Sequence, residues 1–96
     1  MAEKRYQRRR TAEYVAECDK IRQQIYDIKD AYGMSWADIA RADKDWNITG
    51  SRLTIIIHPD NNASLLTLCR VLDAAKAAAE TREETIAYVK KKYGGI

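Results

Sequence analysis

The sequence predicts an all-α domain of five to six helices, with a long first helix and an extra helix at the C-terminus. Apolar residues recur every three or four positions along most of the chain, which is the spacing of one helix face. Serine or threonine precedes several of these stretches, where its side chain can cap the free amides of a helix start. Gly33 and the only proline, Pro59, each follow such a stretch and predict where a helix ends.

The first helix is expected to begin near Glu13 and to end at Gly33, which can adopt the left-handed conformation of a C-cap. Its apolar stripe steps by four and three residues and consists of Tyr14, Cys18, Ile21, Ile25, Ile28 and Tyr32. Such a stripe can pair two chains as a coiled coil. We expect it instead to pack on the helices that follow, within a domain that covers residues 13–80.

Residues 35–57 predict two short helices joined by a turn, a helix-turn-helix. Ser35 can cap the first helix, from about residue 36 to 42, and Asp38 stands three positions later, as in a capping box. The polar loop that follows, DKDWN, ends at Asn47, which can adopt the left-handed conformation that a sharp turn needs.

Thr49 can cap the second short helix, and Pro59 stops it. Leu53 and Ile56 occupy the face that we expect to be buried. This leaves Ile55 on the outer face of the helix.

The rest of the chain predicts two further helices. Ser64 can cap the first of them, whose apolar stripe is made of Leu65, Leu68, Cys69, Leu72 and Ala75. Thr81 or Thr85 can start a last helix, within a C-terminal segment of residues 81–96 that ends in a basic tail. Its apolar side is formed by Ile86, Val89 and Tyr93. This last helix and the alanine-rich residues 74–79 are candidates for a dimer contact.

Three short stretches resemble a known family. Residues 62–68, Asn-Ala-Ser-Leu-Leu-Thr-Leu, are similar to the Asn-Pro-Ser-Leu-x-Thr-Leu run that follows the recognition helix of lambda-repressor-like (Cro/Xre-type) helix-turn-helix domains. Ser35 with the Ile39-Ala40 pair matches their Ser-x-x-x-Leu-Ala, and residues 48–53 match their Val-Ser-x-x-x-Ile. The resemblance covers roughly residues 21–77. The chain differs in its longer loop between the two helices and in Trp36, where a glutamine is frequent.

The resemblance implies a small transcriptional regulator of phage-repressor type, cytoplasmic and associated with the nucleoid of a prokaryote or phage. It would bind double-stranded DNA as a homodimer, with the second short helix in the major groove. The residues of this recognition helix that would meet DNA are Thr49, Gly50, Ser51, Arg52, Thr54 and Ile55. Arg52 can bind guanine in a bidentate manner and Ile55 can contact a thymine methyl group. Ser35 and Trp36, at the start of the preceding helix, would face phosphates.

The net charge of +3 conceals opposite contributions from different regions. Residues 1–10 sum to +4, from five basic residues and one acidic residue, and the three lysines of residues 90–92 add +3. Residues 11–89 sum to −4, from nine basic and thirteen acidic residues, so strong DNA affinity has to come from the termini. We expect residues 1–12 to form a flexible basic arm that clamps DNA; simple solvated tails are the alternative. The arginines of this arm are Arg5, Arg8, Arg9 and Arg10.

A different class of function is suggested by the consecutive isoleucines of residues 55–57. If only Leu53 and Ile56 are needed inside, Ile55 and Ile57 form an exposed apolar patch of the kind that marks a partner site. The helix-turn-helix would then be a protein-binding module, as in an antitoxin or a phage-encoded adaptor. Alternatively, the long loop with Trp46 folds over the patch and buries it.

No constellation of residues in the sequence predicts an enzyme, a cofactor or a metal site. His58 is the only histidine, and no glycine-rich phosphate loop is present. Cys18 and Cys69 fall on apolar stripes, where we expect reduced thiols in the core. No run approaches the ~20 apolar residues of a membrane span. The arginines near the start precede no apolar signal segment, so we expect no export.

Overall fold

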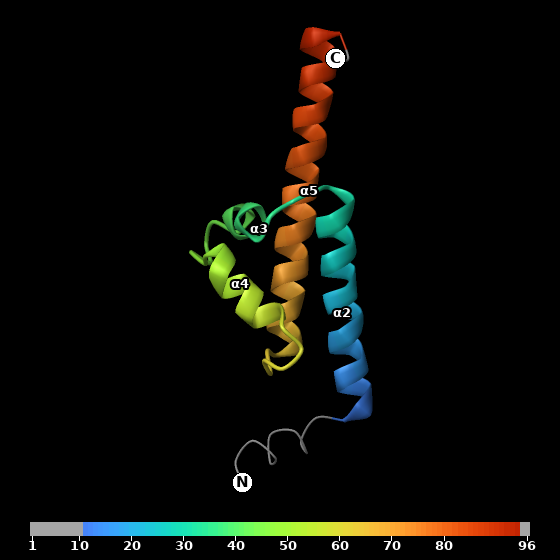
Figure 1. The fold of residues 1–96 in the computed structure, drawn as a ribbon, viewed down its shortest axis with the longest axis vertical. Helices are drawn as coiled ribbons and strands as arrows, with labels where there is room; N and C mark the ends of the chain where they lie inside the picture. Colours follow the sequence, from blue (N-terminus) through green and yellow to red (C-terminus); the bar gives the residue numbers. More distant parts are fainter. Residues whose placement is uncertain (1–10, 95–96) are drawn as a thin grey trace.

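The computed structural model describes residues 11–94, which form four helices and no strand (Figure 1). In chain order these are α2 (Ala12–Ala31), α3 (Trp36–Ala42), α4 (Gly50–Ile57) and α5 (Leu65–Tyr93). The all-α class is therefore confirmed, whereas the number of five to six helices is wrong for this part of the chain. No helix among residues 11–94 is both long enough and apolar enough to cross a membrane.

The difference in helix number lies in α5, one helix of 29 residues where the sequence predicts two. Neither Thr81 nor Thr85 starts a helix. Their hydroxyls instead donate hydrogen bonds backwards, from Thr81 to the carbonyl of Ala77 at 3.1 Å and from Thr85 to the carbonyl of Thr81 at 2.9 Å. A threonine caps a helix only where its own backbone is extended. No glycine or proline between residues 65 and 93 interrupts the helix, so α5 continues.

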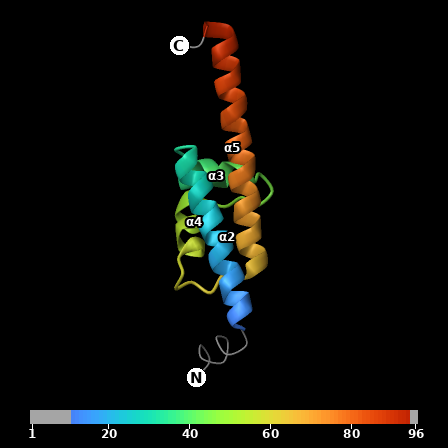
Figure 2. The ribbon, with the colours of Figure 1, turned by 90° about the vertical axis from the view of Figure 1, so that its right-hand side faces the viewer.

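Helices α2 and α5 lie side by side and run in the same direction (Figures 1 and 2). At one end the Leu65 amide donates to the Tyr14 hydroxyl at 2.8 Å, and at the other end the Tyr32 hydroxyl donates to Glu83. Both bonds join residues 51 positions apart, so the two helices stay in register over their common length. The predicted stripe of the first helix faces this contact, with Cys18 and Ile25 fully buried, and therefore packs within the domain.

The two short helices α3 and α4 cover the other side of α5. Their bounds and caps agree with the sequence prediction: Ser35 forms a full capping box with Asp38, and the Thr49 side chain accepts from the Arg52 amide. Asn47 has the predicted positive φ of 51°, as does Gly33 with a φ of 60°. The core between α3, α4 and α5 is formed by fully buried side chains, among them Ile39, Leu53, Leu68 and Val71.

Helix α5 is longer than the rest of the domain. Its C-terminal part, residues 83–93, extends beyond the ends of α2 and α3 with no other described helix beside it (Figures 1 and 2). We call this part the projecting segment. It carries the lysines of residues 90–92 to the opposite end of the molecule from the start of α2.

Candidate nucleic-acid interface

Helix α4 turns one face to the core and the other to solvent. Leu53 and Ile57 are the buried anchors, at 0% and 2% exposure. Four of the predicted recognition residues lie on the open side: Ser51, Arg52, Thr54 and Ile55. These positions offer hydroxyls, one guanidinium and one aliphatic group within two turns of helix, a set that can contact base edges and thymine methyl groups.

The sequence prediction for the isoleucines of α4 is wrong in one respect. Ile57 is buried and Ile56 is half-buried, whereas we expected Ile56 inside and Ile57 outside. Residues three and four positions after Leu53 both lie on the same helix face as Leu53. In the structure the residue four positions later, Ile57, is the one that packs in the core. The predicted patch is therefore reduced to Ile55, which is 51% exposed.

The long loop between α3 and α4 is fastened to α5. The carboxylate of Asp43 accepts two hydrogen bonds from the Arg70 guanidinium, at 2.7 and 3.2 Å, and this pair holds the pKa of Asp43 below its usual range. The same guanidinium lies 4.6 Å from the ring centre of Trp46. The loop thus packs towards α5 and leaves Ile55 open, so the alternative in which the loop covers the patch is not what the structure shows.

The first residues of α3 and α4 lie against each other. A Cβ atom on Gly50 would be 2.8 Å from the amide nitrogen of Ala37, so only glycine permits this approach without a shift of the backbone. The close packing of α3 on α4 therefore explains the glycine at position 50 without any contact to DNA. Ser35 and Thr49, the caps of the two helices, are both exposed here. Each oxygen already accepts a backbone amide at 3.1 Å, which leaves each hydroxyl free to donate to an acceptor such as phosphate.

Trp36 is held by α2 and does not project freely. Its ring meets Tyr26 edge-on at 5.9 Å, and the Lys29 ammonium lies 5.2 Å from the ring centre. The stacking brings a positive charge to the beginning of α3, a feature that sequence reasoning missed. No local pattern could have indicated Lys29, because the contact joins the last turn of α2 to a different helix.

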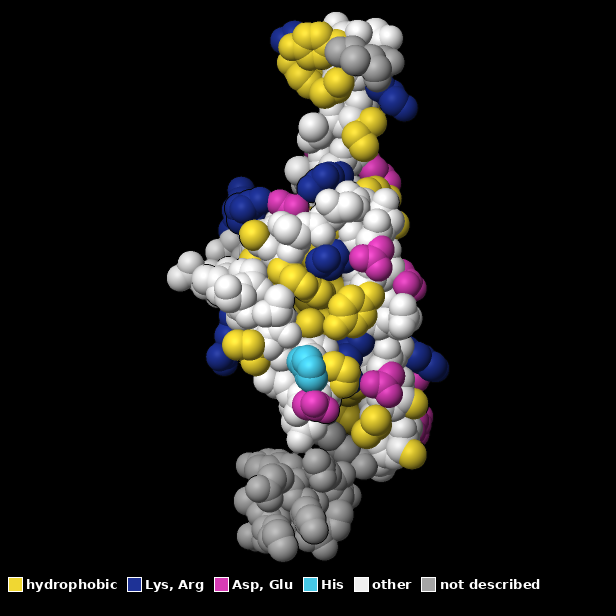
Figure 3. Space-filling model, viewed as in Figure 1, with side chains coloured by type: hydrophobic (Ala, Val, Ile, Leu, Met, Phe, Trp, Pro, Cys, Tyr) yellow, Lys and Arg dark blue, Asp and Glu magenta, His cyan; other side chains and the backbone are white. Residues whose placement is uncertain are grey.

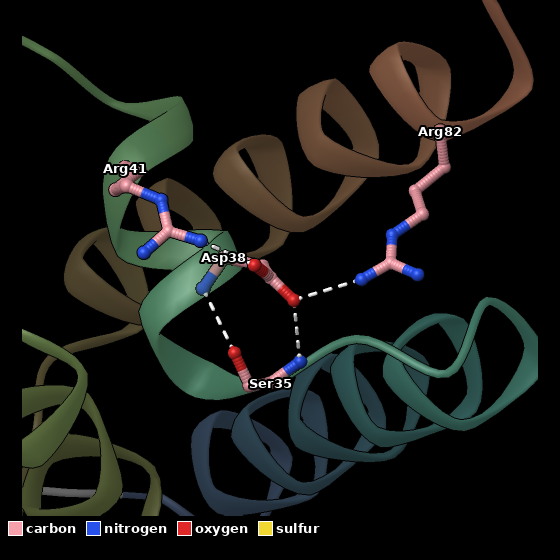
Figure 4. A network of polar contacts seen from close by, with 4 residues as sticks. All are labelled: Ser35, Asp38, Arg41 and Arg82. Atoms are coloured by element: carbon pink, nitrogen blue, oxygen red, sulfur yellow. Dashed lines mark hydrogen bonds and ion pairs between the residues drawn. The ribbon is translucent and has the colours of Figure 1, made fainter. Parts of the chain in front are cut away.

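Asp38 is the centre of a polar network that ties α3 to α5 (Figure 4). Its carboxylate accepts from the Ser35 amide at 2.9 Å, from Arg82 of α5 at 2.9 Å and from Arg41. The bond from the Ser35 amide is the main reason why the pKa of Asp38 is lowered. The two arginines are thereby partly neutralised, which reduces the positive potential at this end of α3.

The lysines of the C-terminal tail stand apart from this surface. Arg5, Arg8, Arg9 and Arg10 lie outside the described residues, and the lysines of residues 90–92 are at the tip of the projecting segment, remote from α4 (Figure 1). Residues 11–94 hold twelve basic and thirteen acidic residues, a net charge of −1. The described fold therefore supplies shape and hydrogen-bonding groups for a nucleic-acid contact, and little net charge.

No protein-family model, curated protein or solved structure matches the chain. Within residues 11–94, no group of three or more His, Cys, Asp or Glu side chains could hold a metal ion. Cys18 is buried and Cys69 half-buried, and both are free thiols. The lone histidine, His58, ends α4, where its Nδ1 accepts the amide of Asp60 at 3.1 Å.

Proposed function

We propose that the chain is a small transcriptional regulator of phage-repressor type, which binds duplex DNA as a dimer with α4 in the major groove. The observation that carries the proposal is the open face of α4, where Ser51, Arg52, Thr54 and Ile55 are all exposed while Leu53 and Ile57 fix the helix from below. Hydroxyls, a guanidinium and a β-branched side chain suit base edges, and a helix fits the width of the major groove. The resemblance to lambda-repressor-like domains supports the same docking.

Phosphate contacts would come from the adjoining starts of α3 and α4. Ser35 and Thr49 have hydroxyl hydrogens to donate there, and Lys29 can reach a phosphate from its position on Trp36. Since the net charge of the described residues is −1, most of the salt-dependent affinity would come from the arginines of residues 1–10.

The test is fluorescence anisotropy of the full-length chain on duplexes that tile the DNA flanking its own coding sequence, with scrambled duplexes as references. We expect one native duplex to bind tighter than the scrambled DNA by ~10³-fold or more at physiological salt. Arg52→Ala should weaken that complex by about 1–3 kcal/mol, because a bidentate contact is lost.

The matched control is Lys20→Ala, which removes one positive charge from an exposed site on α2 (67% side-chain exposure), a helix outside the helix-turn-helix. It should leave the specific complex nearly unchanged. Equal losses for the two variants, or equally weak binding to every duplex, would contradict the proposed docking. In the second case Ile55 becomes the first place to look for a protein partner.

A further inference from the structure

The projecting segment has an apolar side that no described residue covers fully. Ile86 is 51% exposed and Tyr93 is 54% exposed, and the half-buried Val89 lies between them on the same side of the helix. Figure 3 shows hydrophobic side chains open to solvent on this part of α5, apart from the body of the domain. An isolated stretch of helix this short is only marginally stable in water unless something packs on its apolar side.

This bare side continues the stripe by which α5 packs in the domain. The stripe alternates steps of three and four residues without interruption, through Leu65, Leu68, Leu72, Ala75, Ala79, Arg82, Ile86, Val89 and Tyr93. As far as Ala79 it is covered by the rest of the domain, and it becomes bare beyond Arg82 because α2 and α3 end there. An apolar repeat of this period is the pattern by which two helices pair as a coiled coil.

We infer that the projecting segment pairs with the same segment of a second copy of this chain, in antiparallel orientation. A parallel partner helix would have to continue along the stripe towards Leu65, where the chain's own α2 and α3 already lie. An antiparallel pair overlaps only the two projecting segments and leaves the two domains at opposite ends. The inference rests on the dimer that the proposed function includes. Its test needs no DNA, so a failure of the antiparallel pairing can be distinguished from a failure of DNA binding.

The charges of the segment are self-complementary in this orientation. Glu83 and Glu84 stand at its base, directly after Glu80 and Arg82, so that residues 80–84 sum to −2, and residues 90–92 at its tip are all lysine. Two-fold symmetry then places each lysine tip beside the acidic base of the other copy. In the register that puts Ile86 opposite the partner's Val89, Glu83 and the partner's Lys90 flank the stripe on the same side. Each directly follows a stripe residue, so their charges face each other across the pair. A parallel pair would instead bring six lysines together.

A groove at the base of the segment offers space for the tip of the second copy. It has a volume of about 880 Å³ and lies between α3, the end of α2 and α5, continuous with Ile86. Its lining combines aliphatic side chains, among them Met34, Ala42, Ala78 and Ile86, with polar and charged ones, which include Asp38, Arg41, Lys44, Thr81 and Arg82. In the same register Arg82 faces the partner's Tyr93, an aromatic ring on which a guanidinium can stack. The tip of each copy would thus end against the groove of the other.

The first experiment is sedimentation equilibrium of the full-length chain without DNA, over a concentration series up to about 1 mM. We expect the mass to rise from 11.0 kDa towards about twice that value. Val89→Glu should abolish the rise, because the pair would bury two carboxylates, each opposite the partner's Ile86. The control is Tyr88→Ser, an exposed aromatic residue off the stripe (58% exposure), which should leave association intact.

The second experiment reverses charges. Glu83→Lys and Lys90→Glu should each weaken self-association by at least about tenfold, because each places like charges opposite one another twice per pair. Mixing the two variants in equal amounts should restore association, since every facing pair is then opposite in charge. Circular dichroism of each variant checks that the fold is kept, because Glu83 also accepts a hydrogen bond from Tyr32.

Three outcomes would overturn the inference. The wild-type chain could stay monomeric to the highest concentration. Val89→Glu could associate as well as Tyr88→Ser does. Association could also be lost with Val89→Glu but be unaffected by the charge reversals or unrestored by mixing, which would contradict the antiparallel register.

Discussion

The two parts of α5 have the same apolar spacing and opposite surroundings. In residues 65–79 the stripe is covered by the rest of the domain, and Leu68 and Ala75 are 0% exposed. In the projecting segment the stripe continues, but Ile86 and Tyr93 keep more than half of their surface open. Spacing thus predicts which side of a helix is apolar, and the ends of neighbouring helices decide where that side is covered.

Truncation of one stripe residue in each part tests this contrast most strongly. Leu68→Ala should lower the free energy of unfolding by roughly 2–5 kcal/mol, because it leaves a cavity in the core. Ile86→Ala should cost less than about 1 kcal/mol when measured at a concentration low enough to keep the chain monomeric, because water already reaches the side chain. Urea unfolding followed by circular dichroism measures both. Similar losses would mean that the projecting segment is covered within one chain.

Proline at two exposed alanines of α5 tests whether the two parts unfold together. Ala77 and Ala87 are ten positions apart, and neither side chain is buried. Ala77→Pro should cost about 3 kcal/mol, because it breaks the helix where α2 and α3 hold it. Ala87→Pro should cost much less, because only the projecting segment has to unwind. Thermal unfolding with a helicity measurement distinguishes the two; equal losses in melting temperature would show that α5 unfolds as one unit.

The helix-turn-helix was predictable because its signals are local. Ser35 with Asp38 and Thr49 with the Arg52 amide are contacts over three residues, and such caps set where α3 and α4 begin. Asn47 likewise adopts the turn conformation expected from its own side chain. The exposed face of α4 follows from the same periodicity, which is why Arg52 and Ile55 lie where we expected them.

Other features depend on partners distant in sequence and could not be predicted. Thr81 is a potential cap in sequence, but a helix already begun at Leu65 and packed on α2 passes through it. Ile57 is buried instead of Ile56 because the core beneath α4 selects one of two allowed steps. The bond from Arg82 to Asp38 joins residues 44 positions apart and ties two helices that the sequence alone does not place together.

The smallest effect is expected for the Asp43–Arg70 ion pair, which holds the loop of the helix-turn-helix to the packed part of α5. Arg70 lowers the pKa of Asp43, mainly through its hydrogen bonds, so the folded state favours the ionised carboxylate more than the unfolded state does. This stability is present at neutral pH and is lost as the pH falls below about 4 and through the lowered pKa of the folded protein. Asp43→Asn should therefore be less stable than the wild type at pH 7, and the difference should shrink towards zero in acid.

The control for this comparison is Asp73→Asn, an exposed carboxylate on α5 that forms no ion pair with any residue in the described part of the chain. Urea unfolding of the three proteins between pH 7 and about pH 2 gives the answer. A difference between Asp43→Asn and the wild type that stays constant across this range would mean that the Asp43 side chain stabilises the loop by its shape and not by its charge. A difference that vanishes in acid would show that the charge of the Asp43 carboxylate, through its bonds to Arg70, holds the loop on the packed part of α5.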